Sequence, residues 1–395
     1  MALALEGLRV LDLTRVLVGP YTTMILADLG AEVIKLEMPG TGDDARAFPP
    51  HINGESAYFM SLNRNKRSMT LNLKSERGKV LFIEMVKSVD IVVENFRPGT
   101  MERLGVGYDV LREANPSLIY AAASGFGQTG PYSRRPAYDA IVQAMGGIMS
   151  ITGQAGGIPT RVGSSIGDII AGLFATIGIL AAVTHRQKTG QGQQIDVSML
   201  DSQVAILENA IARYTAAGEV PQPIGNRHPA ITPFEPFDTK DGQLMIAAGN
   251  DVLWAKLCKS INCVELISDP RFLTNTLRTE NHRELKQLLT DRIREKSTET
   301  WRALLDEAGV PNGPINSIDQ VVIDPQVIAR EMIVEVDHPQ AGKTLLPGIP
   351  IKMSETPGSI RQPAPLLGQH TFEILHDVFG YTPEQIASFE GLGLF

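Results

Sequence analysis

The residue best suited to chemistry is Asp168, in the run Ser164-Ser-Ile-Gly-Asp168 at the start of a long apolar stretch. The stretch predicts a buried helix, and a helix begins with unpaired N–H groups and a partial positive charge. We expect this charge to keep Asp168 ionised, and Gly167 allows a ligand to approach the backbone closely. An ionised aspartate placed in this way is a competent nucleophile toward an activated acyl carbon. On local sequence alone, a helix N-cap is the commoner role for such an aspartate.

Basic side chains suited to an anionic ligand fall in three segments, Asn63-Arg-Asn-Lys-Arg67, Lys74 and Asn95 to Arg103. Arginine binds phosphate in a bidentate manner, and Arg97 follows a predicted strand, where open α/β sheets bind ligands. A solvated charged face is the simpler explanation for any one of these residues. His228, in a polar loop, is the histidine of most interest, although a surface position is again the simpler explanation.

The run Gly125-Phe-Gly-Gln-Thr-Gly130 follows a predicted strand and fits the glycine pattern of dinucleotide-binding proteins. However, Pro131 and Pro136 stand where the phosphate-binding helix should begin, so we do not expect NAD. The chain has no P-loop, zinc-protease, Cys-x-x-Cys or Gly-x-Ser-x-Gly motif, and we expect no metal. The two cysteines, Cys258 and Cys263, are expected to be buried packing residues in a reducing compartment.

Composition narrows the class of partner. The chain of 395 residues is 43% hydrophobic and 20% charged, which is typical of a globular protein long enough for two domains. Its net charge of −8 argues against nucleic acid, because phosphate binding favours a basic surface. The longest apolar stretch, 169–183, is shorter than the ~20 residues that span a bilayer, so we expect no membrane association. The first residues resemble neither a secretion signal nor a transit peptide, and the cytoplasm is the expected location.

The elements that must position these residues form an α/β pattern. Short β-rich runs alternate with helical runs in the first half, which predicts a parallel sheet with right-handed crossovers. Strands are expected at 8–13, 32–36, 91–94, 118–124 and 194–198, and helices at 21–29, 76–87, 101–114, 168–187 and 200–217. A segment rich in proline and glycine, 218–236, then leads to a smaller α/β unit. Further elements are a strand at 243–248, helices at 251–261, 283–296 and 300–308, strand patterns within 334–353 and a helical tail at 371–379.

Taken together, these features resemble the family III coenzyme A transferases, a group that includes formyl-CoA:oxalate transferase, carnitine CoA-transferase and the α-methylacyl-CoA racemases. The resemblance covers essentially the whole chain. It rests on Leu11-Asp-Leu-Thr, Gly19-Pro20, Leu29 to Lys35, Pro39-Gly40, Asn63 to Ser68, Glu94 to Gly99, Gly125-Phe-Gly127, Tyr138-Asp139, Gly167-Asp168, Lys188 to Gly192, Gly309 to Pro314 and Pro365 to His370.

This resemblance implies an α/β fold with a Rossmann-like large domain, built from both chain ends, and a small α/β domain. It also implies an interlocked, ring-like homodimer, so that the chain's partners are itself and small molecules. The corresponding domains are 1–217 for the first part of the large domain, 218–330 for the linker and small domain, and 331–395 for the return to the large domain.

In this family the aspartate of the Gly-Asp motif attacks an acyl-CoA thioester to give a mixed anhydride. Coenzyme A thiolate converts the anhydride to an aspartyl-CoA thioester, and the acceptor acid then enters. By resemblance Asp168 takes this role, with coenzyme A and acyl-CoA as substrates, and backbone amides near Asp168 would donate to the tetrahedral intermediates. The coenzyme is expected to contact Val16, Asn72, Leu73, Lys74, Asn95, Phe96, Arg97, Arg103, Ala137, Tyr138 and Asp139. Met38 stands where the family often has an arginine near the adenine.

The branches of the family differ at a few positions. A racemase needs a histidine paired with the aspartate, and Tyr138 stands at that position. The oxalate-specific branch has a glutamine where this chain has Leu17, and a long glycine-rich flap that is absent from 225–250. The nearer likeness is to succinyl-CoA-dependent transferases that accept dicarboxylates such as glutarate, hydroxymethylglutarate, mesaconate or citramalate. It rests on Leu13 to Leu17, Gly225 to His228, Phe237 to Gly242, Ala248 to Asn250 and Gly313 to Asn316.

Candidate contacts to the acid substrate are Arg15, Leu17, Arg46, Arg227 and His228, because a bidentate arginine suits a distal carboxylate. Other functions remain open at this point. They are a formyl-CoA:oxalate-type or carnitine-type transferase, a 2-methylacyl-CoA racemase, and a noncatalytic protein that binds coenzyme A.

Overall fold

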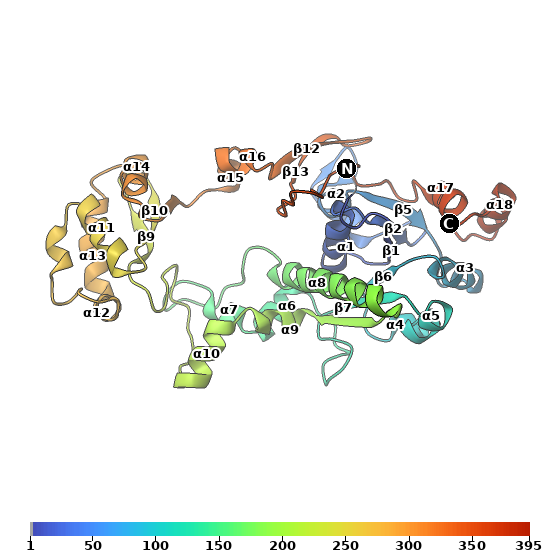
Figure 1. Cartoon of the computed structure of the whole chain (residues 1–395), viewed down its shortest axis with the longest axis horizontal. Helices are drawn as coiled ribbons and strands as arrows, with labels where there is room; N and C mark the ends of the chain where they lie inside the picture. The colour runs from blue at the N-terminus through green and yellow to red at the C-terminus, as the bar shows by residue number, and fades with distance from the viewer. Residues whose placement is uncertain (1–2) are drawn as a thin grey trace. The chain divides into compact units, whose positions relative to one another are not determined.

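The computed structural model describes residues 3–395 and divides the chain into two compact units (Figure 1). The large unit comprises the residues up to Met149, Arg161–Val220 and Pro325–Phe395. The small unit comprises Ser150–Thr160 and Pro221–Asp324. Each unit buries apolar side chains of its own, so each is described by itself.

Six parallel strands form the sheet of the large unit, in the order β5-β2-β1-β6-β7-β8. Their bounds are β1 Arg9–Asp12, β2 Glu32–Glu37, β5 Lys66–Thr70, β6 Ile91–Glu94, β7 Ile119–Ser124 and β8 Gln194–Ser198. The chain builds outward from β1 to β5 and then crosses back to β6 on the other side of β1. Such a switch in direction opens a crevice at the carboxyl ends of the two central strands, where open α/β sheets bind ligands.

Helices cover both faces of this sheet. On one face α1 (Val18–Asp28) and α8 (Ile166–Thr189) pack together over Val10 and neighbouring side chains. On the other face α3 (Glu76–Val86), α5 (Tyr108–Ala114) and α18 (Pro383–Gly391) pack over Leu11. Successive strand residues point to opposite faces, which is why Val10 and Leu11 belong to different cores. The C-terminal segment, red in Figure 1, therefore packs against the sheet made by the N-terminal half.

The remaining elements around this sheet are shorter. They are η1 Asp44–Ala47, β3 His51–Ile52, β4 Glu55–Ser56, α2 Ala57–Asn63, α4 Thr100–Arg103, α6 Asp139–Met145, α7 Ile148–Ile151, α9 Met199–Ala205, α10 Glu208–Ala217, α16 Pro325–Ala329, β12 Ile333–His338, β13 Gly342–Pro347, α17 Thr371–Glu373 and η3 Ile374–Val378.

The small unit packs helices on a three-stranded antiparallel sheet of order β11-β10-β9. Its elements are β9 Phe234–Asp238, β10 Gln243–Ala247, α11 Asp251–Ser260, η2 Val264–Ile267, α12 Asn275–Glu280, α13 His282–Ile293, α14 Thr298–Ala308, β11 Asn312–Pro314 and α15 Ile318–Val322. Cys258 and Cys263 are free thiols within its core, as predicted.

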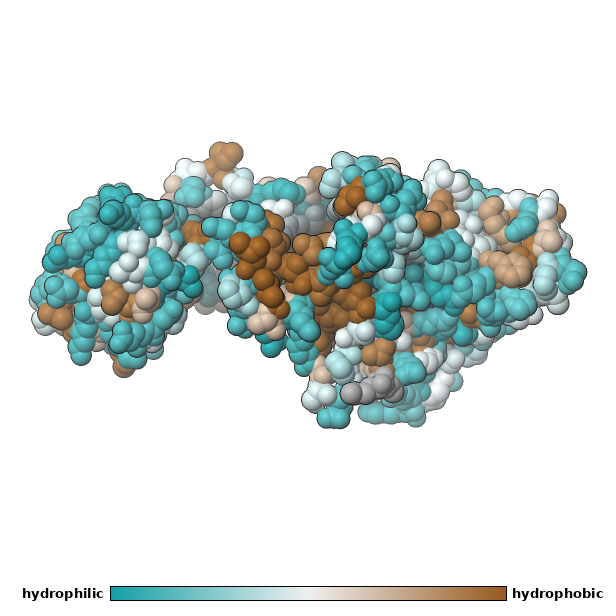
Figure 2. Space-filling view, turned by 90° about the horizontal axis from the view of Figure 1, so that it is seen from above, coloured by the Kyte–Doolittle hydropathy of each residue, from teal (hydrophilic) through white to brown (hydrophobic). Residues whose placement is uncertain are grey.

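Helix α8 is longer than the sequence suggested. It has 24 residues and is apolar enough to span a membrane by length and composition, a test that core helices also pass. One of its faces is buried in the large unit, with Ala171, Ala175 and Ile179 almost inaccessible to solvent. The opposite face leaves Phe174 and Ile177 exposed. Apolar side chains also gather in a continuous patch on the face of the molecule seen in Figure 2.

Candidate active site

Asp168 lies in the first turn of α8 but does not cap the helix. The N-cap residue is Ser165, and α8 begins at Ile166. The N–H of Gly167 donates to Oδ1 of Asp139 at 2.9 Å, and that of Ile169 donates to the carbonyl of Ser165. The common explanation, a helix N-cap, therefore does not apply to Asp168. The backbone amides on either side of it are also occupied, so the prediction that they stabilise an oxyanion is not supported.

The environment of Asp168 favours its neutral form. Burial, followed by the negative charge of Asp139, raises the pKa of Asp168 to about 7, and the backbone N–H of Val18 opposes the shift by hydrogen bonding to the carboxylate. Within residues 3–395, Asp168 forms no ion pair with a lysine or arginine. The prediction that the helix start keeps Asp168 ionised is therefore wrong. Near neutral pH the carboxyl exists in both forms, and its ionised form is a strong base and an unpaired nucleophile.

A cavity of about 250 Å³ surrounds Asp168 at the carboxyl ends of the central strands. Its walls come from the turn after β1, the loop after β6 and the segment before α6, which is the crevice that the switch in strand order predicts. The predicted site residues that line it together with Asp168 are Arg15, Val16, Asn95, Phe96, Arg97, Ala137 and Tyr138.

The turn after β1 is held by side chains from three other segments. The side-chain amide of Asn95 forms two hydrogen bonds to this turn: its oxygen accepts from the Arg15 N–H at 2.8 Å, and its nitrogen donates to the Arg15 carbonyl at 2.7 Å. The N–H of Val16 donates to Oδ1 of Asp43 at 3.0 Å. Nζ of Lys35 donates to the carbonyl of Thr14 at 2.9 Å. These bonds fix a wall of the cavity, and they occupy the polar atoms of Asn95 that we expected to contact the coenzyme.

A second, mainly apolar cavity of about 320 Å³ adjoins the first. The two cavities share Arg15 and Phe96, and the Arg15 guanidinium lies over the Phe96 ring at 5.2 Å. Five leucines contribute to its lining, and Met38 also lines it, with 49% of its surface exposed. The predicted contacts Asn72, Leu73 and Lys74 line this second cavity. Arg103 lies in a further hollow, which Arg97 also borders together with Arg134.

Several predicted site residues have other partners. Arg46 binds Glu37 with two nitrogens, at 2.8 and 2.7 Å, and lies over the Phe59 ring at 3.7 Å. These contacts occupy its guanidinium and argue against a role in binding substrate. Asp139 is buried and accepts from Gly167 and from Gln143, so it supports α8 rather than lining the cavity.

Three other predicted contacts are not among the residues that line the cavity. Leu17 is buried at the N-cap of α1. Arg227 and His228 belong to the small unit, where the ring of His228 packs on Phe234.

The basic segment 63–67 does not offer free charges to a nucleotide. Arg64 pairs with Asp28 at 2.8 Å, Lys66 with Asp12 at 3.0 Å, and Arg67 with Glu32 and Glu373, each at 2.8 Å. Lys66 and Arg67 form part of β5, a strand that we did not predict because its first residues are charged. The interpretation of this segment as a nucleotide site was wrong, since its side chains hold the sheet edge together.

Three residues near the cavity gave no clear signal in the sequence. Burial raises the pKa of Glu94 to about 7, even though the carboxylate accepts from the Phe96 N–H at 2.7 Å. Burial, followed by the charge of Asp168, raises the pKa of Tyr58 to about 12, which places that phenol in the electrostatic reach of the nucleophile. Arg135 lines the cavity and lies over the Phe126 and Tyr132 rings. Only Glu94 belonged to a predicted motif, the segment from Glu94 to Gly99.

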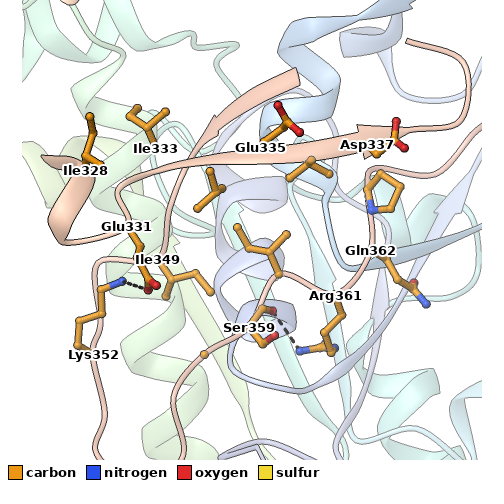
Figure 3. Close-up of a pocket in the computed structure, with 15 residues that line it drawn as sticks. Ile328, Glu331, Ile333, Glu335, Asp337, Ile349, Lys352, Ser359, Arg361 and Gln362 are labelled. Carbon is orange, nitrogen blue, oxygen red and sulfur yellow. Dashed lines mark hydrogen bonds and ion pairs between the residues drawn. The ribbon is translucent and has the colours of Figure 1, made fainter. Parts of the chain in front are cut away.

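A further hollow of about 570 Å³ lies along β12 and the segment 358–363 of the large unit (Figure 3). In Figure 3, Lys352 points to Glu331, at 3.7 Å, and Arg361 points to Ser359, whose carbonyl accepts from it at 3.3 Å. None of the predicted site residues lines this hollow. It is therefore not a candidate active site.

The fold and the cavity define an α/β enzyme that presents a carboxylate to its substrate. The profile described as "CoA-transferase family III" matches residues 5–371. The chain is 45% identical to succinyl-CoA:glutarate CoA-transferase of Mus musculus, over 95% of this chain and 87% of that protein. It is 46% identical to acetyl-CoA:oxalate CoA-transferase of Acetobacter aceti, over 88% of this chain and 89% of that protein.

Solved structures agree with these sequence matches. A CAIB/BAIF family protein from Brucella suis superposes with a TM-score of 0.85 at 38% identity, covering 96% of this chain and all of that one. The chain belongs to the family III coenzyme A transferases, as its motifs indicated.

Proposed function

We propose that this enzyme moves coenzyme A from succinyl-CoA to a free dicarboxylic acid, through covalent intermediates on Asp168. The observation that carries the proposal is the Asp168 carboxylate, which forms no ion pair within residues 3–395 and lines a cavity at the switch point of the sheet. The two relatives described above are named for transfer to glutarate and to oxalate, both of which are dicarboxylic acids. They differ in the donor that their names give, which makes donor choice the first point to measure.

The proposed reaction conserves the activated acyl bond at every step. A carboxylate oxygen of Asp168 attacks the thioester carbonyl, the C–S bond breaks, and coenzyme A thiolate leaves a mixed anhydride. The thiolate then attacks the Asp168 carbonyl carbon, releasing succinate and forming an aspartyl thioester. The acceptor carboxylate attacks this thioester and expels the thiolate, which finally attacks the acceptor carbonyl and regenerates Asp168. Each step needs the ionised form of the nucleophile, and the enclosed cavity limits hydrolysis of the anhydride.

We infer that coenzyme A extends from the apolar cavity to the Asp168 cavity. The two cavities share Arg15 and Phe96 in their linings, which supports this path, because the coenzyme is too long for either cavity alone. The exposed guanidinium of Arg97, with Lys74 and Arg103 nearby in the lining, suits the phosphates. Leucine side chains and Met38 offer an apolar surface to the adenine, in place of an arginine stack.

Arg15 is the best-placed residue to hold the distal carboxylate of the acid. It lines the same cavity as Asp168 and pairs with Asp44 at 3.2 Å. Both side chains of that pair are largely exposed, so the pair is weak and the guanidinium can exchange Asp44 for a substrate carboxylate. The Arg15→Lys variant should raise KM for the diacid about tenfold and leave KM for acyl-CoA within about twofold.

The direct test is incubation with succinyl-CoA or acetyl-CoA and a panel of mono- and dicarboxylic acids, followed by mass spectrometry of the CoA thioesters. Wild type should form new thioesters with diacids, whereas Asp168→Ala should form none. Asp109→Ala is a matched control, since Asp109 is an exposed aspartate in the first turn of α5. Hydroxylamine should convert the aspartyl thioester to a hydroxamate on the peptide that contains Asp168. Transfer by Asp168→Ala, or α-proton exchange in a 2-methylacyl-CoA without transfer, would contradict the proposal.

We also propose that two copies of the chain form the interlocked homodimer of the family. The exposed apolar residues Leu173, Phe174 and Ile177 on α8 support this, because large apolar patches mark interaction surfaces. Cover by a second copy, rather than by lipid, also agrees with the expected cytoplasmic location. Light scattering should give twice the mass of the chain for wild type. The Ile177→Glu variant, which places a charge on this apolar surface, should be monomeric. A monomeric wild type would rule this out.

A further inference from the structure

The turn between β1 and α1 contains the least favourable backbone conformation near the active site. Val16 has a φ of 67°, in the left-handed region that a β-branched residue rarely adopts. Such a conformation persists only where surrounding contacts impose it, and it is concentrated at functional sites. Two residues later, Val18 begins α1 and lines the same cavity as Asp168, where its backbone N–H stabilises the ionised carboxylate. The strained turn therefore leads directly to a backbone group that stabilises the ionised form of the proposed nucleophile.

Two side chains hold this turn from separate segments. Asn95, from the end of β6, binds both backbone groups of Arg15, and Asp43 accepts from the Val16 N–H. Asp43 is fixed in turn by a fully buried ion pair with Lys35, at 2.9 Å. Lys35 also donates to the carbonyl of Thr14. The backbone polar groups from the Thr14 carbonyl to the Val16 N–H are thus all bonded to these three side chains.

The other side of the hydrogen bond is fixed by close helix packing. A Cβ on Gly172 would lie 2.9 Å from the Val18 carbonyl, so only glycine permits α8 to approach the start of α1 this closely. Oγ1 of Thr22 donates to the Gly172 carbonyl at 3.1 Å and joins the two helices. These contacts hold α8 against the start of α1, and the turn enters Val18 from the other side.

We propose that Asn95 and Asp43 are positioning residues, which clamp the strained turn at Val16 so that the Val18 N–H meets the Asp168 carboxylate. This inference rests on the proposed function of Asp168. The clamp supplies a hydrogen bond to the charged form of the nucleophile, and it assigns Asn95 to the protein backbone instead of to coenzyme A. The titratable groups in electrostatic reach of Asp168 are Asp139 and Tyr58, and the titratable or charged groups lining its cavity are Arg15, Asp44, Arg97, Arg135 and Tyr138.

The first test compares wild type with Asn95→Ala in single-turnover acyl transfer across pH 5–9. The rate falls on the acid side of the profile, which we call the acid limb, as Asp168 becomes protonated. Loss of the Val18 hydrogen bond should shift the midpoint of the acid limb to a higher pH, by about half a pH unit. The rate at neutral pH should fall about tenfold, with KM for acyl-CoA changed by less than about twofold. A rise of about tenfold in KM with an unmoved limb would make Asn95 a coenzyme contact and overturn the inference. Asp28→Asn, which disturbs a buried ion pair at the other end of α1, is the control and should leave the limb in place.

The second test compares Asp43→Ala with Asp43→Asn. Asparagine restores an acceptor for the Val16 N–H, so Asp43→Asn should recover most of the rate that Asp43→Ala loses. Equal loss in both variants, with the acid limb unmoved, would show that Asp43 does not act through the turn. If Asp43→Ala does not fold, the Asn95 comparison decides.

The pKa of Asp168 can also be measured without turnover, by infrared titration of its carboxyl group. The signal of Asp168 is the difference between the spectrum of each protein and that of the same protein carrying Asp168→Asn. Transfer by Asp168→Ala would refute the proposed function alone, whereas an unmoved infrared titration in Asn95→Ala would refute the clamp alone.

Discussion

Two groups of buried carboxylates meet at the turn after β1, and their charge environments are opposite. The first is the Asp168 cavity, where the carboxylate faces Asp139 and forms no ion pair in the described chain. The second is a buried ion cluster that consists of Asp12, Lys35, Asp43 and Lys66, all without exposed side-chain surface. Burial would raise the pKa of Asp12, but the charges of Lys66 and Lys35 and bonds from two threonine hydroxyls lower it to about 2. The lysines of the large unit's core therefore stabilise the scaffold, and neither Lys35 nor Lys66 pairs with Asp168.

The difference shows how one fold obtains both a rigid turn and a reactive carboxylate. An aspartate paired with lysine is permanently ionised but is a weak nucleophile, because its charge is already compensated. An aspartate buried without a cation keeps its basicity, at the cost of being partly protonated near neutral pH. The predictions below test this contrast, from the largest expected effect to the smallest.

The ion cluster should dominate stability. The Asp12→Ala variant removes the partner of Lys66 and leaves that ammonium buried, so it should lower the free energy of unfolding by about 3–5 kcal/mol in urea denaturation. The control variant Glu76→Ala breaks an exposed ion pair with Lys79 and should change the free energy of unfolding by less than about 1 kcal/mol. If Asp12→Ala lowers the free energy of unfolding no more than this control does, the ion cluster does not stabilise the fold, and its contrast with the Asp168 cavity is wrong.

The catalytic carboxylate should dominate the pH dependence of the rate. Since the pKa of Asp168 is raised to about 7, the ionised fraction falls about tenfold for each pH unit below it. Because half of the carboxyl is ionised at pH 7, single-turnover transfer should decrease about 50-fold between pH 7 and pH 5. Activity regained on return to pH 7 would show that the protein stays folded. A rate that is constant down to pH 5 would mean that Asp168 is ionised there, as the helix start alone would predict.

Much of the fold followed from sequence pattern. Apolar runs gave β6 with its bounds, and β1, β2 and β7 within a residue or two, because buried parallel strands are nearly continuous in hydrophobicity. Strand β8 was also placed with its bounds, although its residues alternate between polar and apolar. Strand β5 was missed, since Lys66 and Arg67 suggest a surface segment and their buried acidic partners lie far away in the chain. The helix expected at 101–114 is two short helices, α4 and α5, because Gly105 adopts a positive φ between them.

The site was predictable only in part. Asp168, Arg97, Ala137 and Tyr138 were proposed from family motifs, and the structure brings these four residues to one cavity. Whether a side chain is free depends on partners that local sequence does not reveal. Arg46 and Asn95 look like ligand contacts in the sequence, yet both are occupied within the protein. The pKa of Asp168 likewise depends on burial and on Asp139, which is 29 residues away in sequence and adjacent in space.

Stability should respond to pH in opposite ways at the two sites. The folded-state pKa of Asp168, about 7, lies above its unfolded value near 3.8, so ionising this group destabilises the folded protein as pH rises between them. Asp168→Asn should therefore stabilise the protein at pH 8, by on the order of 2 kcal/mol, and this gain should shrink as pH falls toward 5. Asp12 contributes stability above pH 4 that is lost as pH falls toward 2, because its folded pKa is lowered. Equal unfolding free energies for wild type and Asp168→Asn at pH 8 would contradict the contrast.

The smallest expected effect separates the two causes of the raised pKa of Asp168. Asp139→Asn removes the neighbouring charge but keeps an acceptor for the Gly167 N–H, so burial remains and repulsion is lost. The acid limb of the rate profile should move down by a few tenths of a pH unit, which makes transfer at pH 6 about twofold faster than in wild type. Asp201→Asn, an exposed aspartate in the first turn of α9, should leave the limb in place. An unmoved limb in Asp139→Asn, with the protein folded, would mean that burial alone sets the basicity of the nucleophile.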